Sequence, residues 1–136
     1  MAIITSRAAG RIADEILSTH DEILAISIIN EKGGNILASK SEESFKKAFG
    51  VTREAGKYEG TLAIASLAVA NEVKQVAGEA RTLITIYEKC KMMLLPFPSY
   101  EILVGLVLPC SVNAEDYKIE DNLERLLAHS HKQQQQ

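Results

Sequence analysis

The spacing of apolar residues changes repeatedly along the chain, from the period of a helix to the alternation of a strand and back. The first two strands are expected at Ile23–Ile29 and Asn35–Ser39, joined by a turn that contains Gly33 and Gly34. Glycine adopts the positive φ of a hairpin turn without steric cost. Three more strands are expected later in the chain, at Thr82–Tyr87, Lys91–Leu95 and Glu101–Leu108. Five strands in one short chain restrict it to a few small scaffolds built around a single sheet.

Four stretches have helical patterns, at Ser6–Ser18, Ser41–Phe49, Thr61–Ala77 and Ala114–Ala128. The order of elements is therefore α-β-β-α-α-β-β-β-α, which predicts an α/β domain of the α+β kind with a five-stranded, mainly antiparallel sheet. Strands that are apolar on both faces require cover on both sides of that sheet. The 136 residues fit one domain. We place it at residues 1–128 and expect a disordered polar tail at residues 129–136.

Composition excludes several classes of function. A net charge of −3 and a pI near 5.6 argue against a dedicated nucleic-acid binder, which usually presents a basic face. The longest apolar stretches, Leu62–Ala70 and Ile102–Pro109, fall short of the roughly 20 residues that span a bilayer. Cys90 and Cys110 show neither metal-ligand spacing nor a CxxC motif. Reduced thiols in a cytoplasmic protein are therefore expected.

The helix expected at Thr61–Ala77 is unusual because its first half is apolar on nearly all sides. A surface helix normally carries one apolar stripe, so a helix of this kind must be covered twice. Ala63, Ala70 and Ala77 lie seven residues apart and would allow a second copy of the helix to approach closely. The alternative is that the first and last helices of the same chain supply the second cover. We favour self-association.

Self-association would also use the edge of the strand Thr82–Tyr87, because an unpaired strand edge can pair with another chain. The expected dimer contacts combine this edge with the helix. They are Ala63, Leu67, Ala70, Val73, Thr82, Ile84 and Ile86.

The sequence shows no catalytic constellation, no cofactor motif and no metal-binding motif. His129 and His131 form a His-x-His pair, but they lie in a polar stretch without further ligands at suitable spacing. Cys90 lies between two lysines, and adjacent cations favour a reactive thiolate. With no histidine nearby to act as a base, an ordinary free thiol is the preferred interpretation. His20 is expected at the C-terminal end of the first helix, where a positive charge is favoured.

The segment Ile23–Ser39, a strand, a Gly-bearing turn and a strand ending in Leu37-Ala38-Ser39, resembles the opening hairpin of roadblock/dynein-light-chain domains. The apolar helix and the three strands after it extend the resemblance over about Ser6–Leu108. The resemblance implies a profilin-like or longin-like fold with helices on the faces of a five-stranded sheet, in a distant member of archaeal or bacterial type. It also implies a non-enzymatic homodimer that scaffolds or regulates a partner such as a small GTPase. No catalytic residue is carried over.

Three features depart from the pattern of that family: the long segment Ser41–Gly60, the interruption Pro96-Phe97-Pro98 and the helix after Leu108. A ligand-sensing domain of the PAS or GAF type is the alternative function. Such a domain would hold a small apolar ligand between sheet and helices, in a cavity on the order of a few hundred Å³.

Overall fold

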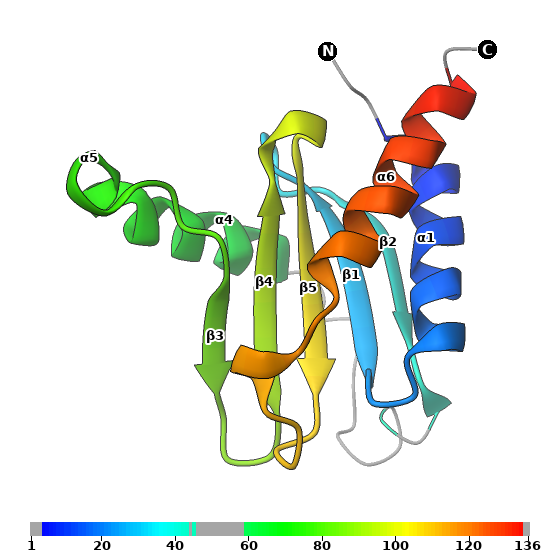
Figure 1. The fold of residues 1–136 in the computed structure, drawn as a ribbon, viewed down its shortest axis with the longest axis horizontal. Helices are drawn as coiled ribbons and strands as arrows, with labels where there is room; N and C mark the ends of the chain where they lie inside the picture. The colour runs from blue at the N-terminus through cyan, green and yellow to red at the C-terminus, as the bar shows by residue number, and fades with distance from the viewer. Residues whose placement is uncertain (1–3, 44, 46–58, 135–136) are drawn as a thin grey trace.

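The computed structural model describes residues 4–43, 45 and 59–134. These residues form one five-stranded antiparallel sheet, with strand order β2-β1-β5-β4-β3. Helices α1 and α6 lie side by side on one face, and α4 crosses the other face (Figure 1). The elements are α1 (Ser6–Thr19), β1 (Ala25–Asn30), β2 (Ile36–Ser41), α4 (Glu59–Ala70), the 3₁₀ turn η1 (Asn71–Val73), α5 (Lys74–Ala77), β3 (Leu83–Ile86), β4 (Lys91–Phe97), η2 (Pro98–Tyr100), β5 (Ile102–Leu108), η3 (Ala114–Asp116) and α6 (Glu120–Gln134).

The sheet separates two apolar cores. Because side chains alternate along a strand, Val104 and Leu106 of β5 enter the larger core, while Leu103 faces the other side. The larger core also takes the buried stripes of α1 and α6, including Ile16 and Leu123. The smaller core consists of Ile29, Ala63, Leu67 and Leu103. The expectation that a strand apolar on both faces is covered on both sides is therefore confirmed for β5.

The first helix and the opening hairpin form as expected. Thr5 caps α1 by accepting a hydrogen bond from Ala8 N at 3.1 Å. Gly34 has φ 73°, and its N–H donates to Asn30 O at 2.8 Å to close the turn. The pairing of β1 with β2 shifts register between Ile28 and Ile29, so that Leu37 of β2 is the extra residue of a bulge.

The expected helix Thr61–Ala77 is interrupted. Regular α4 ends at Ala70, and η1 separates it from the single turn of α5. Asn71, whose helix propensity is low, stands where α4 gives way to the tighter turn. The short helix expected at Ser41–Phe49 lies for the most part outside the described residues.

The interruption expected at Pro96-Phe97-Pro98 does not occur where it was placed. Strand β4 continues through Pro96, which pairs with Leu103 of β5, and ends at Phe97. Proline is tolerated there because β3 pairs with β4 only as far as Leu94, so no strand on the outer side requires a donor. The register of β5 with both neighbouring strands passes through Gly105 without a shift.

The end of the chain also differs from expectation. Asn113 caps the 3₁₀ turn η3 instead of a long helix, and α6 begins only at Glu120. Helix α6 then continues to Gln134, so the prediction of a disordered tail is wrong for residues 129–134. Ser130 is buried, and the ring of His131 meets Tyr100 edge to face with centroids 6.2 Å apart. The prediction relied on polar composition, which does not show that Ser130 and His131 pack against the rest of the domain.

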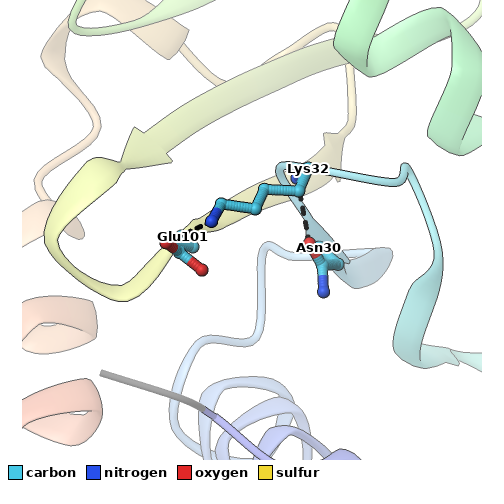
Figure 2. A network of polar contacts seen from close by, with 3 residues as sticks. All are labelled: Asn30, Lys32 and Glu101. Atoms are coloured by element: carbon cyan, nitrogen blue, oxygen red, sulfur yellow. Dashed lines mark hydrogen bonds and ion pairs between the residues drawn. The ribbon is translucent and has the colours of Figure 1, made fainter. Parts of the chain in front are cut away.

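A polar network fixes the hairpin turn against the turn between β4 and β5 (Figure 2). Lys32 Nζ lies 3.1 Å from Glu101 Oε1, and Lys32 N donates to Asn30 Oδ1 at 2.9 Å. The main chain contributes as well, since Glu31 N donates to Glu101 O at 2.9 Å. Glu101 has φ 55° and ψ 41°, a left-handed conformation that is costly for residues other than glycine, asparagine and aspartate.

We expect Glu101→Val to lower the free energy of unfolding by about 1–3 kcal/mol, since a β-branched side chain is strained at positive φ. Lys32→Ala, which removes only an exposed ion pair, should cost less than about 1 kcal/mol. Glu101→Gly should stay closer to wild type than Glu101→Val. Urea denaturation would measure all three. Equal losses for Lys32→Ala and Glu101→Val would show that the ion pair, not the backbone, is decisive.

Candidate self-association surface

Helix α4 has two apolar sides, and the described chain covers only one of them. Ala63 and Leu67 are buried against Ile29 and Leu103 of the sheet. On the other side, Leu62 is 55% exposed and Val69 is 73% exposed. These two residues lie seven positions apart, which places them on one stripe of the helix. The expectation of a helix that needs two covers therefore matches the structure, and the second cover is open to a partner.

The apolar stripe continues beyond the edge of the sheet. The end of α4, η1 and α5 extend past the outer side of β3 (Figure 1), and we call Val69–Ala77 the overhang. Val73 is 60% exposed and Val76 is 95% exposed. The chain returns through Gly78, whose φ of 83° permits the sharp reversal. Asn71 Oδ1 accepts a hydrogen bond from Ala80 N at 3.0 Å, which holds the returning chain against the overhang.

Strand β3 forms the free edge of the sheet beside the overhang. Tyr87 N donates to Cys90 O at 2.8 Å, so the main chain of Tyr87 faces β4. Main-chain groups alternate in direction along an antiparallel strand, so Ile84 and Ile86 point their N–H and C=O groups away from β4. The strand Leu83–Ile86 contains neither a charge nor a proline. It therefore lacks the usual protection of an edge strand.

The opposite edge of the sheet is better protected. Strand β2 carries Lys40, whose Nζ lies 3.8 Å from Asp14 Oδ1, and the bulge at Leu37. Lysines and bulges are features that discourage pairing between exposed edges. Of the two edges, β3 is the one suited to pairing with another chain.

An apolar groove of about 300 Å³ opens on the α4 face of the sheet. Leu62 and Ser66 of α4 form one wall, and Thr85 and Tyr87 form the other. Gly105 lies in the groove and contributes no side chain to fill it. The remaining lining residues are Ile29, Ala63, Leu83, Met92, Met93 and Leu94.

The structure places the predicted contact residues in different environments. Ala63 and Leu67 are buried within the chain, so their side chains are already occupied by the sheet. Ala70 is half-buried, whereas Val73 and Ile86 are exposed.

The strand residues divide in the same way. Thr82 is half-buried and its hydroxyl donates to Glu120 Oε1 at 3.2 Å. Ile84 packs against the larger core. Its side chain is therefore used within the chain, while its main-chain groups lie on the free edge.

Sequence reasoning missed Leu62, Val69 and Val76 as surface residues. They repeat every seven positions, as do Ala63, Ala70 and Ala77. The sequence signal was the larger size of the missed side chains, which would form a ridge on one unbroken helix. In the structure, η1 separates Val76 from Leu62 and Val69.

Cys90 is not activated by its neighbours. Burial, followed by the nearby Cys110 thiol, raises the pKa of Cys90. Lys91 Nζ donates instead to Val112 O at 2.7 Å. This supports the interpretation of Cys90 as an ordinary thiol. In the described residues no group of three or more His, Cys, Asp or Glu side chains is placed to hold a metal ion, and His129 and His131 form no such site.

His20 ends α1 as expected and also links this helix to α6. His20 Nε2 lies 3.1 Å from Asn122 Nδ2, and the Tyr117 hydroxyl lies 3.4 Å from His20 Nδ1. The same hydroxyl donates to Glu22 Oε2 at 3.2 Å. Burial, with the charge and hydrogen bond of Glu22 as further causes, raises the pKa of Tyr117 to about 12.

This shift predicts a loss of stability in strong alkali. Unfolded tyrosine loses its proton near pH 10, whereas Tyr117 in the folded chain keeps it until about pH 12. The folded state binds the extra proton between these values, so the contribution of Tyr117 is present below pH 10 and is lost as the pH rises toward 12. Alkaline titration of tyrosinate absorbance should show a group that titrates near pH 12. It should be absent in Tyr117→Phe and titrate earlier in Glu22→Gln. An unchanged titration in Tyr117→Phe would contradict the assignment.

Comparison with known proteins places the fold. No family model and no curated protein sequence matches the chain. The structure of the gliding protein MglB from Thermus thermophilus matches at 16% identity and a TM-score of 0.71, over 94% of this chain and 91% of that one. A Roadblock/LC7 domain from Streptomyces avermitilis matches at 8% identity and a TM-score of 0.60, over 90% of this chain and 91% of that one. The chain has the roadblock/LC7 fold.

A further structure, described as MglB with tetrameric arrangement, matches at 15% identity and a TM-score of 0.72, over 97% of this chain and 96% of that one. At these identities the comparisons establish the fold, and the resemblance seen in the sequence is confirmed at that level. In the part of the chain that is described, no helix is both long and apolar enough to cross a membrane.

Proposed function

We propose that this chain is a non-enzymatic regulatory module that works as a cytoplasmic homodimer and scaffolds or regulates a small GTPase. One observation carries the self-association: helix α4 is apolar on two sides, and its uncovered side lies beside an unprotected strand edge. Exposed apolar surface of this kind usually marks an interface. A second copy of the chain offers the same helix and the same edge, so one symmetric contact covers both.

The geometry suits a two-fold axis perpendicular to the sheet at the edge of β3. Such an axis pairs β3 with its copy in antiparallel fashion and joins the two sheets. The main-chain groups of Ile84 and Ile86 then gain partners that the described part of the single chain does not supply. Both copies of α4 lie on the same face of the joined sheet, so their exposed stripes can share one apolar interface.

The proposed GTPase partner rests on the roadblock resemblance and on the absence of a catalytic arrangement in the sequence. The MglB structure with tetrameric arrangement supports self-association, because it shows that a protein of this fold forms assemblies. The outer surface of α1 and α6, on the other face of the joined sheet, would remain available for a partner.

A ligand-sensing function is the second candidate, and the apolar groove beside α4 favours it. Its volume of about 300 Å³ is at the lower end of the range for small-molecule sites. Native mass spectrometry of the purified protein would detect a retained small molecule. Such a molecule at full occupancy would favour the sensor over the regulator.

Light scattering should give a mass of about twice 14.9 kDa, independent of concentration in the micromolar range. Ile86→Pro should shift the protein to monomers with an unchanged circular dichroism spectrum, since it removes an outward-facing N–H and leaves the pairing with β4 intact. Thr85→Pro is the matched control, because its N–H faces β4 and its loss should lower the melting temperature. Ile86→Val should remain dimeric. A monomeric wild type at all concentrations would refute the self-association.

The partner requires a separate experiment. Binding of the chain to small GTPases loaded with GDP or with a non-hydrolysable GTP analogue should be measured by calorimetry. We expect binding to depend on the nucleotide and to weaken in Ile86→Pro. A stable dimer that binds neither form of any GTPase tested would contradict the GTPase role and leave the self-association standing.

A further inference from the structure

We propose that Cys90 and Cys110 form a redox-sensitive pair, which closes into an internal disulfide when hydrogen peroxide oxidises the chain. They are the two cysteines of the sequence, so an internal disulfide can join no other residues. Both are free thiols in this structure. The inference goes beyond the proposed regulatory function and does not depend on self-association, because both thiols belong to one chain.

The first step is the register of the sheet. Cys90 directly precedes β4, and Cys110 follows the end of β5 by two positions. Lys91 pairs with Leu108, so one position further out Cys90 lies opposite Pro109 and next to Cys110. Paired antiparallel residues have Cα atoms about 4.5–5.5 Å apart, and one residue of offset adds a step of about 3.4 Å along the strand. Together these give a Cα separation within the range of about 4.4–6.8 Å that a disulfide joins.

The second step is a residue that both cysteines contact. Tyr87 N donates to Cys90 O at 2.8 Å in the turn between β3 and β4. Cys110 Sγ lies 3.7 Å from Tyr87 O and 3.6 Å from Glu88 O, so its S–H is directed into the same turn. This turn and the chain after β5 lie together at one end of the sheet (Figure 1). Burial first, and then the neighbouring Cys110 thiol, raises the pKa of Cys90, and the second effect requires the two thiols to be near each other.

The third step is the support of the turn that carries Cys110. Val112 N donates to Pro109 O at 3.1 Å, which closes this turn. Lys91 Nζ donates to Val112 O at 2.7 Å, which ties the turn to the residue immediately after Cys90. Because hydrogen bonds already hold the main chain on both sides, closing the S–S bond orders few further groups.

The chemistry starts at the more accessible sulfur. Cys110 is exposed, whereas Cys90 is half-buried. The Cys110 thiolate attacks one oxygen of the peroxide, the O–O bond breaks, and a sulfenic acid and one water are formed. The Cys90 thiolate then attacks the sulfenic sulfur, so that the S–S bond forms and the oxygen leaves as a second water. In total the two thiols give two electrons and two protons to the peroxide, and a thiol reductant reverses the change by exchange.

The disulfide would have a defined structural effect. It would enclose residues 90–110, which contain β4, η2 and β5. It would also fasten the turn that follows β3 to the chain beyond β5. A cross-link of this kind stabilises a domain mainly by restricting its unfolded state. In a reducing compartment such disulfides are usually transient and redox-sensing, so the pair suits a reversible signal.

Peroxide treatment of the full chain tests the pair directly. In dilute solution the intact mass should fall by two hydrogen atoms, and peptide mapping should find Cys90 linked to Cys110. A dithiol reductant should restore the original mass. Cys90→Ser should instead accumulate a sulfenic acid at Cys110, which dimedone traps. The matched control, Cys110→Ser with Ser111→Cys, moves the thiol by one exposed position and should give much less of the internal link.

Thermal unfolding provides a second measurement. The oxidised chain should melt at least about 5 °C above the reduced chain, because the link restricts the unfolded state. The double variant Cys90→Ser with Cys110→Ser should melt at the same temperature with and without peroxide. This variant also controls for oxidation of methionine side chains.

The outcomes are distinct from those of the self-association experiment. Sulfenic or higher acids without the 90–110 link, or a disulfide between two chains through Cys110, would overturn the inference. An equal yield of internal link in the shifted control would overturn it as well, and so would a link that leaves the melting temperature unchanged or lowers it. The 90–110 link together with a higher melting temperature would support it. A wild type that is monomeric under reducing conditions would refute the proposed self-association and leave this inference standing.

Discussion

The architecture depends on a sheet whose two faces are both apolar. Burying an apolar side chain is worth roughly 1.5–3 kcal/mol, so neither face can be left to water. Helices α1 and α6 together cover one face and build the larger core. Among the described residues, α4 is the helix on the other face, and it buries Ala63 and Leu67 against the sheet. In this part of the chain, two helices cover one face and one covers the other, and the difference leaves both the groove and the exposed stripe.

The two edges of the sheet also differ in how well their main-chain groups are protected. Strand β2 is flanked by α1 and carries a bulge and a lysine, whereas β3 is short, uncharged and without a bulge. Unpaired N–H and C=O groups at a protected edge are satisfied by water at little cost. At β3 they lie next to exposed valines and an apolar groove, where water is a poor neighbour. In the proposed dimer, one partner would cover both the edge and the helix.

Much of the fold could be predicted from the sequence, because strand alternation and the glycines of the hairpin are strong local signals. The candidate self-association surface was harder to predict. A helix that is apolar all round does not reveal which side meets the sheet, so Ala63 and Leu67 were assigned to the interface while Leu62 and Val69 were overlooked. Tolerance of Pro96 depends on the length of the neighbouring strand, and the left-handed Glu101 depends on a contact between distant turns. The extension of α6 depends on packing by polar residues, which composition does not show.

In the proposed dimer, the hydrogen bond from Ala80 N to Asn71 Oδ1 would have a kinetic consequence. By clamping the returning chain, it gives the overhang one shape before any encounter, so association need not wait for a loop to order itself. Ordering that precedes the encounter lowers the entropy lost on binding and lets association proceed at the rate of rigid surfaces. The Asn71 amide, which touches no partner, would in this way influence the association rate. The dissociation rate would depend instead on the exposed valines of the overhang.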